Sequence, residues 1–167
     1  ALDRALGVLR GNLRLFVEKG LLPESEVEPV LARIHPTRSL EDAVGIADLV
    51  VEAVTERKSV KKELFDRLDG LCPKDAILTS NTSALNIFDI TPRPVTTVIA
   101  HWFAPPHILP LVEVVKGPET DDRTVETVVA LLRSTGKTPV VLQRFVGGFV
   151  INRLQRALGR EIFFLLD

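Results

Sequence analysis

The sequence of 167 residues lacks methionine and contains a single cysteine, Cys72. One thiol excludes an internal disulfide and a thiolate metal cluster, and it suits a reducing compartment. No hydrophobic run approaches the ~18–20 residues that a membrane-spanning helix needs, and no signal peptide opens the chain. We therefore expect a cytoplasmic protein with no membrane partner and no bound metal.

An excess of charge of either sign is also missing. The chain has 21 Lys and Arg residues against 22 Asp and Glu residues, a formal net charge of −1. It therefore has no broad basic surface for binding DNA or RNA, and we expect no nucleic-acid partner. The hydrophobic share of 46% and the charged share of 26% are typical of globular domains and exclude disorder.

Hydrophobic residues at helical spacing begin at Leu2 and continue to Val17, and a second helical pattern runs to the last residues of the chain. Because both patterns reach the ends and no methionine is present, we expect the sequence to be a segment of a longer protein.

The spacing of hydrophobic residues predicts alternating helices and strands after an opening pair of helices. Short β-branched runs such as LVVEAV are typical of buried parallel strands. Helices are expected over residues 1–19, 25–33, 40–46, 57–69, 122–135 and 149–166, and a short helix or a turn over 86–90. Strands are expected over residues 49–54, 76–79, 95–103, 111–115 and 139–142.

This alternation predicts an α/β fold with a mostly parallel sheet between helices. Strands 95–103 and 111–115 are separated by too few residues for a helical crossover, so we expect that pair to be antiparallel and the sheet to be mixed.

The first candidate site is the loop T-S-N-T-S at residues 79–83, which follows a predicted strand. Ligands of open α/β sheets bind beyond the carboxyl ends of the strands, and these small polar side chains offer hydrogen bonds. The alternative is an ordinary capped turn, because Ser, Thr and Asn are common in turns.

Glu52, Glu56 and Lys61 surround the end of the strand 49–54 and the start of the next helix. Glu56 and Lys61 have a functional interpretation, beside a ribose or phosphate that lies across the strand ends. The alternatives are that Glu56 complements the positive end of the helix dipole and that Lys61 is a solvated surface residue.

His101 and Glu113 fall in the two strands that we expect to form a hairpin, with PPHILP at residues 105–110 as the reversal. A carboxylate bonded to one ring nitrogen of histidine fixes the tautomer and raises the basicity of the other nitrogen, which is the pairing that acid–base catalysis uses. The alternative is a histidine packed beside Trp102 and a glutamate on a solvated face.

Gly147 and Gly148 turn the chain into the last predicted helix, and Asn152 lies in its first turn. Asn152 either caps the helix or reaches into a cleft. The sequence contains no G-x-G-x-x-G, so the strict dinucleotide-binding fingerprint is absent.

Four segments together resemble the L-3-hydroxyacyl-CoA dehydrogenase family, in the family's order and at similar intervals: VVEAVTERKSVKKELFDRLD (50–69), ILTSNTSAL (77–85), HWFAPPHILPLVEVVKGPET (101–120) and GFVINRL (148–154). The resemblance covers nearly the whole chain. It implies a Rossmann-like NAD-binding domain over residues 1–148, incomplete at the N-terminus, and a helix over 149–167 that leads into a further domain.

The resemblance also implies roles for individual residues. His101 is similar to the family's catalytic base and Glu113 to its carboxylate partner, while Ser83 and Asn152 match residues that hydrogen-bond the substrate oxygen. The positions that match the lining of the NAD ribose and nicotinamide are Ala53, Glu56, Lys61 and Ser83.

The implied reaction is oxidation of an L-3-hydroxyacyl-CoA thioester to a 3-ketoacyl-CoA in fatty acid metabolism, with NAD as cofactor and a homodimer as the assembly. Gulonate and carnitine dehydrogenases share much of the pattern, as does a non-catalytic crystallin branch. The family's glycine-rich phosphate loop and its helical C-terminal domain have no counterpart here, and Ala104 stands where relatives usually have asparagine. We therefore expect this chain alone to bind NAD poorly or not at all and to be inactive.

Overall fold

The computed structural model describes residues 2–166, and the chain divides into two compact units, residues 1–43 and 44–167. The division falls between residues 43 and 44, whereas the domain boundary predicted at residues 148 and 149 lies just before the last helix and stays a prediction. No helix among the described residues is long and apolar enough to cross a membrane.

The first unit is helical. It contains α1 (Leu2–Glu18), the 3₁₀ turn η1 (Glu24–Glu26) and α2 (Val27–Ala32). The single helix predicted over 25–33 therefore starts with a 3₁₀ turn. Pro29 is tolerated in α2 because it lies in the first turn, where a backbone N–H has no acceptor within the helix.

The second unit is built on a five-stranded sheet. Its strands are β1 (Leu49–Glu52), β2 (Ile77–Ser80), β3 (Thr97–Trp102), β4 (Leu111–Val115) and β5 (Thr138–Leu142). Its helical segments are α4 (Lys58–Leu71), η2 (Ile87–Asp89), α5 (Asp122–Ser134) and α6 (Ile151–Leu166), and the short α3 (Leu40–Val44) spans the junction of the two units.

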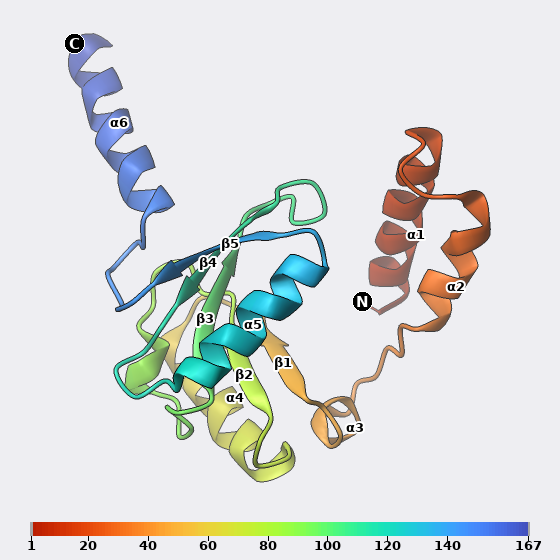
Figure 1. Ribbon diagram of the computed structural model, residues 1–167, viewed down its shortest axis with the longest axis horizontal. Helices are drawn as coiled ribbons and strands as arrows, with labels where there is room; N and C mark the ends of the chain where they lie inside the picture. The colour runs from red at the N-terminus through yellow and green to blue at the C-terminus, as the bar shows by residue number, and fades with distance from the viewer. Residues whose placement is uncertain (1, 167) are drawn as a thin grey trace. The chain divides into compact units, whose positions relative to one another are not determined.

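The strands are ordered β1-β2-β3-β4-β5 (Figure 1). Strands β1, β2 and β3 are parallel to one another, β4 is antiparallel to β3, and β5 is parallel to β4. The mixed, mostly parallel sheet and the antiparallel β3–β4 pair predicted from the short connection are therefore confirmed.

One face of the sheet packs against α5. Val98 and Ala100 of β3 form a buried cluster with Val128 and Leu132 of α5, which lies across one face in Figure 1. Because side chains alternate along a strand, the intervening residues of β3 point to the opposite face. His101 is one of them, so the α5 core and the candidate site lie on opposite sides of the sheet.

Two of the predicted boundaries that differ from the structure have a local explanation. The strand predicted to reach Val54 ends at Glu52, because the Glu52 carboxylate accepts the N–H of Val54 at 2.7 Å and turns the chain. The last helix begins at Ile151 instead of Phe149, because Gly148 and Phe149 both have positive φ, +76° and +50°, which a right-handed helix does not allow.

Candidate active site

His101 and Glu113 are directly opposite each other in the antiparallel β3–β4 ladder. His101 Nδ1 lies 2.8 Å from Glu113 Oε2, and both side chains are buried. The contact predicted from the spacing of these residues is confirmed, and the alternative of a glutamate on a solvated face is wrong. With Nδ1 held by the carboxylate, Nε2 is the ring nitrogen left to exchange a proton with a ligand.

The second oxygen of Glu113 is also occupied. Glu113 Oε1 accepts the backbone N–H groups of Val150 at 2.8 Å and of Ile151 at 2.9 Å, where α6 begins. Unpaired N–H groups at a helix N-terminus carry partial positive charge. This buried carboxylate is therefore compensated on both sides, by the imidazole and by the start of α6.

Aromatic rings surround the imidazole. The ring centroids of Phe103 and Phe149 lie 4.6 and 5.2 Å from that of His101. Phe149 is buried, and among residues 2–166 it is the one residue other than glycine that has a positive φ. Backbone conformations of this kind often occur at functional sites. Phe149 could not be predicted as part of the site, because a Gly-Gly-Phe turn gives no sign of a ring contact with a residue in a distant strand.

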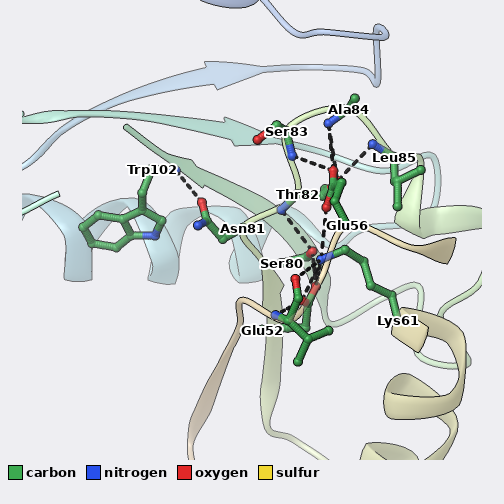
Figure 2. Close-up of polar contacts among 11 residues, drawn as sticks. Glu52, Glu56, Lys61, Ser80, Asn81, Thr82, Ser83, Ala84, Leu85 and Trp102 are labelled. Atoms are coloured by element: carbon green, nitrogen blue, oxygen red, sulfur yellow. Dashed lines mark hydrogen bonds and ion pairs between the residues drawn. The ribbon is translucent and has the colours of Figure 1, made fainter. Parts of the chain in front are cut away.

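A second polar cluster lies at the carboxyl ends of β1 and β2 (Figure 2). Lys61 Nζ of α4 donates to Glu52 Oε1 and Oε2 at 2.6 and 2.8 Å and lies 3.3 Å from Glu56 Oε2. The Lys61 side chain is only 1% exposed, so the interpretation of Lys61 as a solvated surface residue is wrong. Its position on the inner side of α4 puts it against the end of β1.

Glu56 organises the loop that follows β2. Its Oε1 accepts the Thr82 hydroxyl at 2.5 Å and the backbone N–H groups of Ser83 and Ala84 at 2.9 and 3.2 Å. Partial burial disfavours the charged form, but the hydrogen bonds from Thr82 and Ser83, together with Lys61, outweigh it and hold the pKa of Glu56 below its ordinary value. Glu56 thus binds this loop instead of acting only on a helix dipole.

We expect the loop contacts of Glu56 to be lost in acid. Because its pKa is lowered on folding, the stabilisation is present above the ordinary value of 4.5 and disappears as the pH falls through the lowered pKa. The amide resonances of Ser83 and Ala84 should titrate with a midpoint below that value, and the titration should vanish in Glu56→Gln. A midpoint at or above the ordinary value would contradict the assignment.

The loop T-S-N-T-S divides into inward and outward residues. Ser80 and Thr82 are buried and Ser83 is exposed. The capped-turn interpretation applies to Thr82, whose hydroxyl accepts the N–H of Leu85 at 2.9 Å. Asn81 connects the loop to β3, because its Oδ1 accepts the N–H of Trp102 at 2.8 Å.

Asn152 and Ser83 are brought together across 69 residues of sequence. Asn152 Nδ2 donates to the Ser83 carbonyl oxygen at 3.4 Å. Asn152 follows Ile151, whose N–H is bound by Glu113, so the start of α6 meets both the loop after β2 and the His101–Glu113 pair. The structure thus gathers the four residues proposed for catalysis around the beginning of α6.

Three of the four residues predicted to line the cofactor are exposed to solvent. Ala53 follows β1 and is exposed, Ser83 follows β2 and is exposed, and the Glu56 side chain is 41% exposed. They fit the rule that ligands bind outside the carboxyl ends of parallel strands. Buried Lys61 does not fit direct contact. Within residues 2–166, no cluster of three or more His, Cys, Asp or Glu side chains is arranged to hold a metal ion.

Comparison with known proteins identifies relatives of this chain. The family described as "3-hydroxyacyl-CoA dehydrogenase, NAD binding domain" matches residues 1–145. A 5-formyl-3-hydroxy-2-methylpyridine 4-carboxylate 5-dehydrogenase of Mesorhizobium japonicum is 42% identical over 100% of this chain and 54% of its own length. A probable 3-hydroxybutyryl-CoA dehydrogenase of Bacillus subtilis is 40% identical over 92% of this chain and 54% of its own.

Solved structures agree with these relatives. The crystal structure of 3-hydroxybutyryl-CoA dehydrogenase from Escherichia coli K12 has a TM-score of 0.93 and 36% identity, covering 99% of this chain and 35% of that one. The chain therefore spans about half the length of the two curated relatives and a smaller part of this structure.

Proposed function

The chain belongs to the family of 3-hydroxyacyl-CoA dehydrogenase NAD-binding domains, and on this basis we propose that it supplies the catalytic histidine and part of the cofactor site of an NAD-dependent dehydrogenase. The proposed reaction oxidises the 3-hydroxyl group of an L-3-hydroxyacyl-CoA to a ketone. The observation that carries the proposal is the buried contact of 2.8 Å between His101 Nδ1 and Glu113 Oε2.

In the proposed mechanism, neutral His101 removes the hydroxyl proton through Nε2. Glu113 keeps the proton of the neutral imidazole on Nδ1 and stabilises the imidazolium that forms. Ser83 and Asn152 are proposed to hydrogen-bond the oxygen on which charge develops. Bound NAD supplies the hydride acceptor, while the protein contributes position and electrostatics.

We propose that Ala53, Glu56 and Ser83 line the ribose and nicotinamide of NAD. Their exposure at the ends of β1 and β2 supports this assignment. For Lys61 we propose no direct contact with NAD, because its ammonium group is buried behind Glu56. The homodimer, the cytoplasmic location and the domain division at residue 148 stay predictions of the sequence.

The second candidate is oxidation of a substrate without CoA. It is favoured by the relative that is 42% identical and named for a pyridine carboxylate. The two candidates share the His101–Glu113 chemistry and differ in the group beside the reacting carbon. The gulonate and carnitine types belong to this second class. The crystallin-like structural role is disfavoured by the intact pair of His101 and Glu113.

The test compares L-3-hydroxybutyryl-CoA with free L-3-hydroxybutyrate as substrates of a polypeptide that includes these residues. We expect NADH to form with the thioester at a kcat/KM at least about tenfold above that with the free acid. Faster reaction of the free acid would favour the second candidate, and no reaction with either, under conditions where NAD binds, would contradict the dehydrogenase assignment. The 167 residues alone should bind NAD weakly in calorimetry, because the sequence has no G-x-G-x-x-G.

A further inference from the structure

The ion cluster behind the loop after β2 has a carboxylate that the proposed mechanism does not use. Glu52 is the last residue of β1, and its side chain is completely buried. It accepts four hydrogen bonds: two from Lys61 Nζ, one from the Val54 N–H at 2.7 Å and one from the Ser80 hydroxyl at 2.5 Å. Glu52 therefore ties together the ends of β1 and β2 and the inner side of α4.

Lys61 connects this buried carboxylate to an exposed one. Its ammonium group contacts Glu52 on one side and Glu56 on the other, and the Val54 carbonyl oxygen lies 3.5 Å away. An ammonium group has three donors, and four acceptor atoms surround this one: both carboxylate oxygens of Glu52, one of Glu56 and the Val54 carbonyl oxygen. A side chain that is 1% exposed and fully bonded has no donor left for a ligand.

The cluster reaches the candidate site through Glu56 and the loop. Glu56 holds Thr82, Ser83 and Ala84 by three hydrogen bonds. The same loop contains Asn81, whose Oδ1 accepts a hydrogen bond from the backbone N–H of Trp102, the residue after His101. Figure 2 shows this continuous chain of contacts from Glu52 through Lys61 and Glu56 to the loop.

We propose that Glu52 and Lys61 form a buried positioning pair, which fixes the Glu56 carboxylate and through it the loop 81–85 against which the nicotinamide half of the dinucleotide binds. The pair acts through other residues and does not itself touch the ligand. This inference rests on the proposed function for the identity of the ligand, but the positioning of the loop is independent of it.

A cycle of variants separates positioning from direct contact. Glu52→Gln with Lys61→Met neutralises the pair as a unit and so leaves no buried charge unpaired, which favours folding. Glu56→Gln removes the group through which the pair is proposed to act, and the triple variant combines all three changes. Lys62→Met is the matched control, since Lys62 neighbours Lys61 on α4 but is 56% exposed and pairs with Asp66.

Two measurements on the 167-residue chain are made for each variant. The first is amide hydrogen exchange at Ser83 and Ala84 without ligand, with the β3–β4 amides as an internal reference. The second is NADH affinity, followed by NMR titration because that method measures weak binding.

The pair variant and Glu56→Gln should each speed exchange and weaken NADH binding by about tenfold, equivalent to ~1.4 kcal/mol. The exchange rates and the NADH affinity of the triple variant should equal those of Glu56→Gln within about twofold. Both sets of changes interrupt the same series of contacts, so their effects should not add. Lys62→Met should match the native chain. Effects that multiply in the triple variant would show that Lys61 contacts the ligand directly and would overturn the proposal.

Unchanged exchange at Ser83 and Ala84 in the pair variant would also overturn it. If the native chain binds no NADH, the affinities are measured on an active polypeptide that includes these residues. Absence of binding there would contradict the cofactor assignment, and the exchange measurements on the 167-residue chain still decide whether the pair positions the loop. The failure of the proposed function and the failure of this inference are thus distinguishable.

Discussion

Replacing His101 by glutamine should lower kcat by about 10²–10⁴-fold in an active polypeptide that includes these residues, the range typical of a lost general base. Glutamine retains a polar group of similar reach but has no group that takes up a proton near neutral pH. NADH affinity should stay within about threefold, because His101 acts on the substrate proton and is not among the residues proposed to line the cofactor.

Turnover and NADH affinity are measured on the same preparations, and circular dichroism verifies the fold. His35→Gln is the matched control, because His35 is exposed and lies in the helical first unit. It should leave both quantities unchanged. A His101→Gln variant that keeps more than about a tenth of the native kcat would show that His101 is not the general base.

Glu113→Gln should reduce kcat by a similar factor, about 10²–10⁴-fold. The physical reason is that the substitution moves the proton of the neutral His101 ring from one nitrogen to the other. The carboxamide can still offer its oxygen to the N–H groups of Val150 and Ile151, which leaves its NH₂ group facing His101 Nδ1. The NH₂ group only donates, so Nδ1 must become the acceptor and the proton moves to Nε2. The imidazole then lacks the free nitrogen that the reaction needs.

The tautomer is read directly from the ¹⁵N shifts of His101, in the chain itself and without substrate. We expect the protonated nitrogen to change from Nδ1 in the native chain to Nε2 in the variant. Glu126→Gln is the control, since Glu126 is an exposed glutamate of α5. An unchanged tautomer together with unchanged turnover would remove Glu113 from the mechanism.

The elements that could be predicted from the sequence are those with strong local patterns. The predicted bounds of the strand Leu111–Val115 agree with the structure, because Pro110 precedes this apolar run and Lys116 follows it. The His101–Glu113 contact followed from the short connection between two strands, since an antiparallel hairpin leaves few possible registers. Local spacing thus sufficed where the partner residue is near in sequence.

Contacts between distant residues were not predictable. Lys61 resembles any lysine of a basic helix, and only the fold places it against Glu52 and Glu56. A signal was present in Glu52 itself, a single carboxylate in an otherwise apolar strand, because a charge at a buried position requires a partner. Asn81 and Phe149 gave no comparable signal, since their partners are tertiary.

The antiparallel register of β3 and β4 also decides which insertions and deletions the chain can tolerate. Deleting one residue within β4 would turn Glu113 to the α5 face, because a shift of one position moves every side chain of a strand to the other face. Adding a residue to the exposed connection at 104–110 leaves that alternation intact. Residues can therefore be added to the turn. A one-residue deletion within the strand, by contrast, would separate the imidazole from its carboxylate.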